Sequence, residues 1–169
     1  MTQTEADIYS QLLKYLPNAE RTNWSKQLLK QAELHYVVLA ARFAHDVRVG
    51  GFALLLHNLN GQMLAEMEDM LLHAQANFAH EYYIQAIRAS LFHPQDYQDL
   101  LHTLNTEPEA GPEECALAQH LRELSQNYWR ANFPLEVEAQ VFLQTCLEQS
   151  GEPSSPRSKR QKLFSKQLR

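Results

Sequence analysis

The chain has 169 residues, of which 44% are hydrophobic, and it contains only 5 glycines and 7 prolines. This composition is typical of a globular protein and excludes a disordered or collagen-like chain. The longest apolar run, residues 36–41, is too short to cross a bilayer, and the first residues lack the basic and apolar regions of a secretory signal. We therefore expect a cytoplasmic protein with one hydrophobic core and no contact with a membrane.

The charges are distributed unevenly along the chain. Residues 1–152 hold all 20 acidic side chains and nine of the 15 basic ones, which gives this part a formal net charge of −11. Residues 153–169 hold six basic side chains and no acidic one, and this segment is also rich in Pro and Ser. We predict an acidic domain over residues 1–150 and a basic, flexible tail over residues 151–169.

Apolar residues recur at helical spacing almost everywhere, and no segment alternates with period two for long enough to predict a strand. In chain order, helices are expected from about residues 4–16, 22–49, 52–56, 63–74, 77–92, 94–104, 112–128 and 134–147. The second of these is apolar on nearly all sides between Val37 and Ala44, which places it in the middle of a bundle. The sequence thus predicts an all-α fold, a single compact domain of seven or eight helices.

Particular residues predict where these helices begin and end. Gly50 and Gly51 end the second helix, because glycine accepts the left-handed conformation that often follows a helix. Pro112 suits the first position of a helix, where its missing N–H costs nothing. Asn132 suits the cap of the last helix, which Pro134 would open.

The residues with metal-binding or catalytic potential follow no specific pattern. His73 and His80 lie two helical turns apart, too far for one ion, and Glu81 belongs to no HExxH motif. Motifs for a nucleophile, a dinucleotide or a phosphate do not occur. Cys115 and Cys146 are expected to be reduced thiols. We therefore expect no metal, no cofactor and no enzymatic activity.

Most carboxylates are expected on solvated helix faces, because charged side chains are rarely buried. This expectation includes Asp46, which follows His45 near the end of the second helix, and it includes the pairs Glu68–Asp69, Glu113–Glu114 and Glu136–Glu138.

The segment RVGGFALLLHNLNG, residues 48–61, carries the most specific pattern in the chain. It resembles the GGF-x5-N-x2-G signature of a bacterial, all-helical DNA-mimic protein family whose members are mostly uncharacterised. The matching residues are Gly50, Gly51, Phe52, Asn58 and Gly61. The chain departs from the family pattern at Val49, where the family usually has Asn, and at residues 53–56, where it usually has a polar residue, Gln and aromatics.

We expect the motif itself to be structural. Gly51 would let the chain turn, and Phe52 with the following leucines would return to the core. The side-chain oxygens of Asn58 and Asn60 would then cap the next helix, with Gly61 in the turn.

The resemblance implies a homodimer whose surface carboxylates imitate the phosphates of duplex DNA and occupy a DNA-binding protein, such as a helix-turn-helix transcriptional regulator. Duplex DNA carries one charge about every 1.7 Å along its axis, so a mimic needs carboxylates held in rows on a rigid scaffold. The candidates for this acidic surface are Glu66, Glu68, Asp69, Glu107, Glu109, Glu113, Glu114, Glu136 and Glu138.

Three alternatives stay open. The acidic face could instead block a basic toxin such as a nuclease, as an immunity or antitoxin-like protein does. A small ligand or substrate could occupy a pocket near His57 and Asn58. Direct nucleic-acid binding is expected only through the tail, whose candidate contacts are Arg157, Lys159, Arg160 and Lys162.

Overall fold

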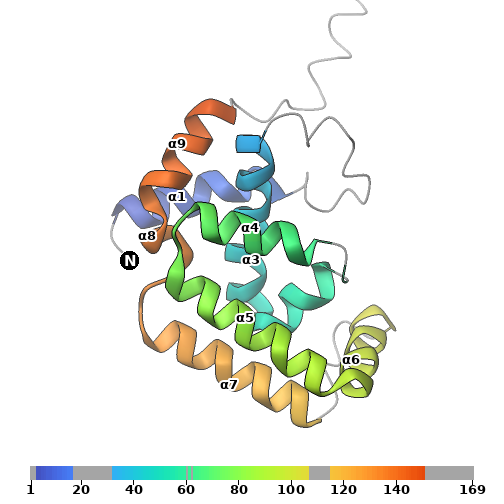
Figure 1. The fold of residues 1–169 in the computed structure, drawn as a ribbon. Helices are drawn as coiled ribbons and strands as arrows, with labels where there is room; N and C mark the ends of the chain where they lie inside the picture. The colour runs from blue at the N-terminus through green and yellow to red at the C-terminus, as the bar shows by residue number, and fades with distance from the viewer. Residues whose placement is uncertain (1–2, 17–31, 60, 62, 107–114, 151–169) are drawn as a thin grey trace, which may run out of the picture.

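The computed structural model describes residues 3–16, 32–59, 61, 63–106 and 115–150. These residues form eight helices and no strand (Figure 1), which confirms the all-α prediction. The helices are α1 (Gln3–Leu13), α3 (Ala32–Leu59), α4 (Leu64–His73), α5 (Asn77–Phe92), α6 (Pro94–Thr106), α7 (Ala116–Arg130), α8 (Leu135–Glu138) and α9 (Gln140–Ser150). In this part of the chain no helix is long and apolar enough to cross a membrane.

Several predictions concern residues that lie outside the described ranges. They are the start of the second helix near residue 22, the helix start at Pro112, the acidic residues of segment 107–114 and the basic tail of residues 151–169.

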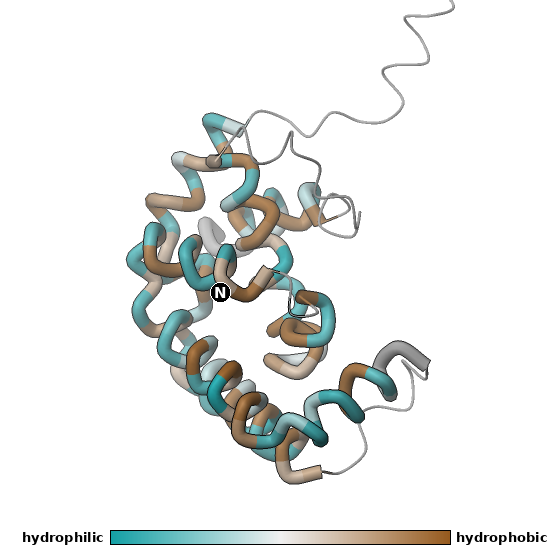
Figure 2. Tube along the Cα trace, turned by 45° about the vertical axis from the view of Figure 1, so that its right-hand side comes forward, coloured by the Kyte–Doolittle hydropathy of each residue, from teal (hydrophilic) through white to brown (hydrophobic). Residues whose placement is uncertain are grey.

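Helix α3 is the central element of the bundle (Figure 1) and packs against α1, α4, α7 and α9. Its residues from Val37 to Ala44 are all buried, as the apolar residues of this segment predict, and the one charged residue among them, Arg42, is buried as well. The surrounding helices contain both apolar and polar residues along their length (Figure 2). Apolar residues at helical spacing let each outer helix bury one face against α3 or a neighbour and expose the other.

The GGF motif interrupts α3 at one residue. Gly51 has φ 69° and ψ −166°, and helical structure resumes after it and continues to Leu59. Helix α7 supplies two side chains at this break: Ser125 Oγ accepts a hydrogen bond from the Phe52 N–H at 2.9 Å, and Trp129 Nε1 donates to the Val47 carbonyl at 3.1 Å. The glycines therefore end the first helical segment of α3, as predicted, and a second helical segment follows in a new direction. This second segment reaches Leu59, beyond the expected end at residue 56.

Phe52 is the aromatic side chain that follows this break into the core. It is fully buried, meets Phe43 and Tyr128 edge to face at ring distances of 6.1 and 5.7 Å, and stacks on Tyr82 at 6.4 Å. The prediction that Phe52 returns to the core is confirmed.

Three helix ends differ from the predictions. Helix α7 begins at Ala116 and is capped by Cys115, which has an extended backbone and whose Sγ accepts from the Ala118 N–H at 3.4 Å. Asn132 lies at φ 51° and caps nothing, because Pro134 occupies the capping position of α8. The expected last helix is also divided at residue 139 into α8 and α9.

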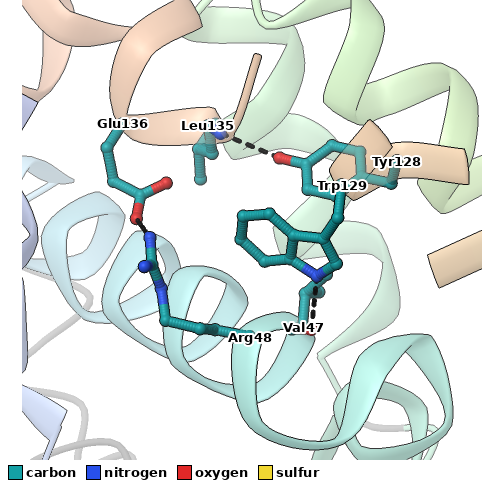
Figure 3. Close-up of polar contacts among 6 residues, drawn as sticks. All are labelled: Val47, Arg48, Tyr128, Trp129, Leu135 and Glu136. Carbon is teal, nitrogen blue, oxygen red and sulfur yellow. Dashed lines mark hydrogen bonds and ion pairs between the residues drawn. The ribbon is translucent and has the colours of Figure 1, made fainter. Parts of the chain in front are cut away.

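The first N–H of α8 is satisfied from within the core. The Leu135 N–H donates to the buried Tyr128 hydroxyl at 2.8 Å (Figure 3). The tertiary contact thus replaces the local cap that Asn132 was expected to supply.

Replacing Gly51 with Ala is expected to destabilise the protein by about 3 kcal/mol. A Cβ at this position would lie 2.4 Å from Ser125 Oγ, so overpacking is added to the cost of a positive φ. Gly61→Ala is the matched control, because Gly61 also has a positive φ, of 72°, but open space around its Cβ, and it should cost about 1 kcal/mol. Urea unfolding measures both, and equal losses would mean that the contact with Ser125 is unimportant.

Candidate functional site

The polar residues at the end of the GGF motif bind back into the protein. Asn58 lies inside α3, and its side-chain amide donates to Asp46 Oδ2 at 3.0 Å. Its carbonyl oxygen lies 3.1 Å from His57 Nδ1. Helix α4 begins after Met63 without a side-chain cap, so the expectation that Asn58 caps this helix is wrong. Asn60 lies outside the described residues.

Asp46 is the buried partner of Asn58. Its side chain is only 1% exposed and lies 3.5 Å from the Arg42 guanidinium, one helical turn away. Its Oδ1 is buried and has no hydrogen-bond partner in the described part of the chain. Burial raises the pKa of this carboxyl, while the Asn58 amide and Arg42 oppose that rise. The prediction of a solvated carboxylate is therefore wrong, because the break at Gly51 allows residue 58 to meet residue 46.

A second carboxylate is buried where α3 meets α8 (Figure 3). Glu136 is 2% exposed, and its Oε1 accepts from Arg48 Nη2 at 2.9 Å. The Arg48 guanidinium also lies over two rings, 4.1 Å from the centroid of Tyr9 and 5.1 Å from that of Trp129. Glu136 is therefore a core residue, and its inclusion in the acidic surface is a wrong prediction.

Glu138 serves the amino terminus of another helix. Its two carboxylate oxygens accept from the backbone N–H groups of Phe78 and Ala79 at 2.6 and 2.9 Å, at the first turn of α5. A carboxylate at this place satisfies N–H groups that have no partner within the helix. Glu138 is half-buried, and both of its oxygens bind within the protein. Its inclusion in the acidic surface is therefore also a wrong prediction.

The candidates on α4 remain at the surface. The side chains of Glu68 and Asp69 are 44% and 56% exposed, and Glu66 is partly exposed. Their partners are neutral groups or histidines: the Tyr36 hydroxyl donates to Asp69 at 3.0 Å, and His80 Nε2 lies 3.3 Å from Glu68. Within the described part of the chain, no Lys or Arg nitrogen lies within 4 Å of these three carboxylates.

Glu66 and Asp69 share a shallow hollow with the first turns of α3. The hollow has a volume of about 490 Å³, and His35 and Tyr36 form its other wall. Burial lowers the pKa of His35, although the nearby Glu66 and Asp69 act in the opposite direction. The Tyr36 ring lies 5.3 Å from His73 and 5.8 Å from Phe142, which holds the Tyr36 hydroxyl beside Asp69.

The two histidines considered as metal ligands, His73 and His80, each lie beside a different carboxylate. His73 lies 3.3 Å from Asp69, whereas His80 lies beside Glu68. In the described residues no group of three or more His, Cys, Asp or Glu side chains is placed to hold a metal ion. Cys115 and Cys146 are both free thiols, as predicted.

The hollow nearest the GGF motif is lined by other residues than those proposed as polar ligands. It is lined by Gly50, Gly51 and Ala53, but neither His57 nor Asn58 contributes to it. The structure therefore does not bring these two side chains to that hollow.

Glu136→Gln should destabilise the protein, whereas Glu66→Gln should leave the free energy of unfolding nearly unchanged. Removing the Glu136 charge leaves Arg48 beside a buried neutral group, and we expect a loss of about 2 kcal/mol. Breaking a fully buried pair costs more, about 3–5 kcal/mol, but the Arg48 side chain is 29% exposed and retains water contact. Urea unfolding of both variants measures the difference, and equal stability would contradict the assignment of Glu136 to the core.

The buried Asp46 predicts a pH dependence that Asp46→Asn should remove. Because the pKa of Asp46 is raised in the folded state, the native protein binds a proton more tightly than the unfolded chain does. The Asp46 contribution to stability is therefore fully present below the ordinary pKa of 3.8 and is lost as the pH rises through the folded pKa. Relative to the variant, the wild-type protein should gain stability as the pH falls from neutral toward 3.8, measured by urea unfolding of both at each pH. A pH-independent difference would contradict the raised pKa.

Comparison with known proteins adds no family to this geometry. No family model matches the sequence, and no curated protein or solved structure matches it either. The site is therefore defined by its own contacts: two buried carboxylates, one helix cap and a group of exposed carboxylates on α4.

Proposed function

We propose that this chain is a non-enzymatic, acidic protein-binding protein that acts as a DNA mimic through the carboxylates of α4. One observation carries the proposal: Asp69 is exposed, Glu66 and Glu68 are partly exposed, and none of the three has a Lys or Arg within 4 Å in the described part of the chain. Their charges remain available to a cationic partner.

The rigidity of the scaffold supports this role. Helix α4 buries Met67, Met70 and Leu71 against the core, which fixes the direction of the carboxylates on its outer face. Successive residues rise about 1.5 Å along a helix axis, so Glu66 and Asp69 are separated by one turn and roughly 4.5 Å of axial rise. A preformed helix holds the backbone of these carboxylates at fixed spacing, so that binding a basic surface orders only their side chains.

The partner that fits this surface is a protein with Lys and Arg arranged to meet DNA phosphates, such as a helix-turn-helix transcriptional regulator. The resemblance of the GGF motif favours this partner, and it also favours a homodimer. A basic toxin such as a nuclease is the runner-up, since it presents the same kind of charge. Identification of the captured partner separates the two.

Neutralising the α4 carboxylates should weaken partner binding at least tenfold. The variant Glu66→Gln/Glu68→Gln/Asp69→Asn removes three charges that steer and hold a basic partner, each worth about 0.5–1 kcal/mol. The matched control is Asp96→Asn/Asp99→Asn/Glu123→Gln, which removes three carboxylates from α6 and α7. An affinity pull-down at low salt identifies the partner, and calorimetry then compares the dissociation constants.

Two outcomes would contradict the proposal. One is equal weakening by the α4 variant and by its control, which would assign the effect to net charge alone. The other is an affinity that does not change between low salt and about 1 M salt, where charges are screened over about 3 Å.

A further inference from the structure

The hollow lined by Gly50, Gly51 and Ala53 is a groove whose chemistry differs from that of the acidic surface on α4. It has a volume of about 620 Å³ and lies between the break in α3 and one face of α7. Its floor is mainly apolar and includes Val47, Ala53, Leu121 and Trp129. Volumes of this size are typical of sites that bind small ligands.

The floor of the groove is held in place by the contacts that stabilise the break. Ser125 Oγ is bound on both sides, since it accepts from the Phe52 N–H and donates to the Leu121 carbonyl at 2.7 Å. The Trp129 indole is fixed by its bond to the Val47 carbonyl (Figure 3). A ligand would therefore meet a preformed surface and would not have to order it.

The rim of the groove is basic in an otherwise acidic domain. Arg122 and Arg130 line it from the exposed face of α7, with Gln126 between them. Residues at i, i+4 and i+8 share one helix face, and eight residues span about 12 Å. Arg48, which pairs with Glu136, lines the groove from α3.

We propose that this groove binds an acidic peptide segment of a partner protein. In an extended peptide, residues i, i+2 and i+4 point to one side, and i and i+4 are about 13 Å apart. Two glutamates at i and i+4 would then meet Arg122 and Arg130, and an apolar residue at i+2 would enter the floor beside Trp129. Arginine pairs well with carboxylates because its planar group donates two parallel hydrogen bonds.

An acidic peptide fits this groove better than a nucleic acid does. The body of the chain carries a formal net charge of −11 and repels a long polyanion. The apolar floor also offers nothing to a phosphate backbone, whereas it matches the apolar side chain of a peptide. The proposal is independent of the acidic surface on α4, because no α4 residue lines this groove.

The test is fluorescence anisotropy with a labelled probe peptide, Gly-Glu-Ser-Leu-Ser-Glu-Gly. We expect saturable binding that weakens at least tenfold for the protein variant Arg122→Gln/Arg130→Gln. The matched control Lys14→Gln/Arg88→Gln removes two exposed basic residues that do not line this groove, and it should bind as the wild-type protein does. Circular dichroism verifies that each variant is folded.

A second protein variant tests the floor without changing any charge. Ala53→Met places a longer side chain in the groove at a helical position and should weaken the probe at least tenfold as well. On the peptide side, replacing Leu with Ser, or both glutamates with Gln, should each abolish measurable binding.

Each alternative result would overturn the proposal. No saturable binding of the probe up to about 1 mM would exclude the site. Equal weakening by the two charge variants, or equal binding of the Leu→Ser peptide, would show attraction by net charge alone. Tighter binding of an oligonucleotide than of the probe, lost in Arg122→Gln/Arg130→Gln, would assign the groove to nucleic acid.

Discussion

The structure depends on the way α7 satisfies the interrupted backbone of α3. A helix that breaks in the middle of a core leaves peptide groups without their usual partners, and buried groups of this kind are costly. Ser125 and Trp129, one turn apart on α7, supply an acceptor to the Phe52 N–H and a donor to the Val47 carbonyl. The same two bonds join α3 to α7 and set the direction of the second half of α3.

The change of direction in α3 determines which nearby charged side chains are buried and what they contact. Asn58 reaches Asp46 only because the helix changes direction at Gly51, and this contact accompanies the burial of a carboxylate in the core. Glu136 and Arg48 form a second internal pair close to the break. Internal ion pairs of this kind add little net stability but cost much when one partner is removed. They therefore favour one arrangement of the helices over others.

Because these carboxylates are internal, the acidic surface is smaller than the sequence predicts. The carboxylates of α4 remain as an exposed group without Lys or Arg neighbours in the described residues, and they underlie the proposed recognition of a basic protein. The arginines of α7 line a different surface, a groove with an apolar floor. A protein with two surfaces of opposite charge can bind two partners of opposite chemistry, so the proposed functions of the two surfaces do not compete.

The sequence by itself determined the features that depend on neighbours three or four residues apart. Helical periodicity predicted the all-α class, the burial of the segment from Val37 to Ala44 and the bounds of α5, because side chains one turn apart share a face. The glycine pair likewise predicted the break, since the left-handed conformation that Gly51 adopts is costly for other residues.

The tertiary structure alone decided which polar residues are internal. Glu136 and Glu138 lie two residues apart in a segment that was expected to be solvated. Yet one pairs with Arg48, 88 residues earlier, and the other caps α5 from 60 residues away. Asp46 was misjudged for the same reason, because its partner Asn58 approaches only after α3 has changed direction. The free energy of a charged side chain depends on the groups that folding brings to it, and these groups are set by the packing of whole helices and not by the local sequence.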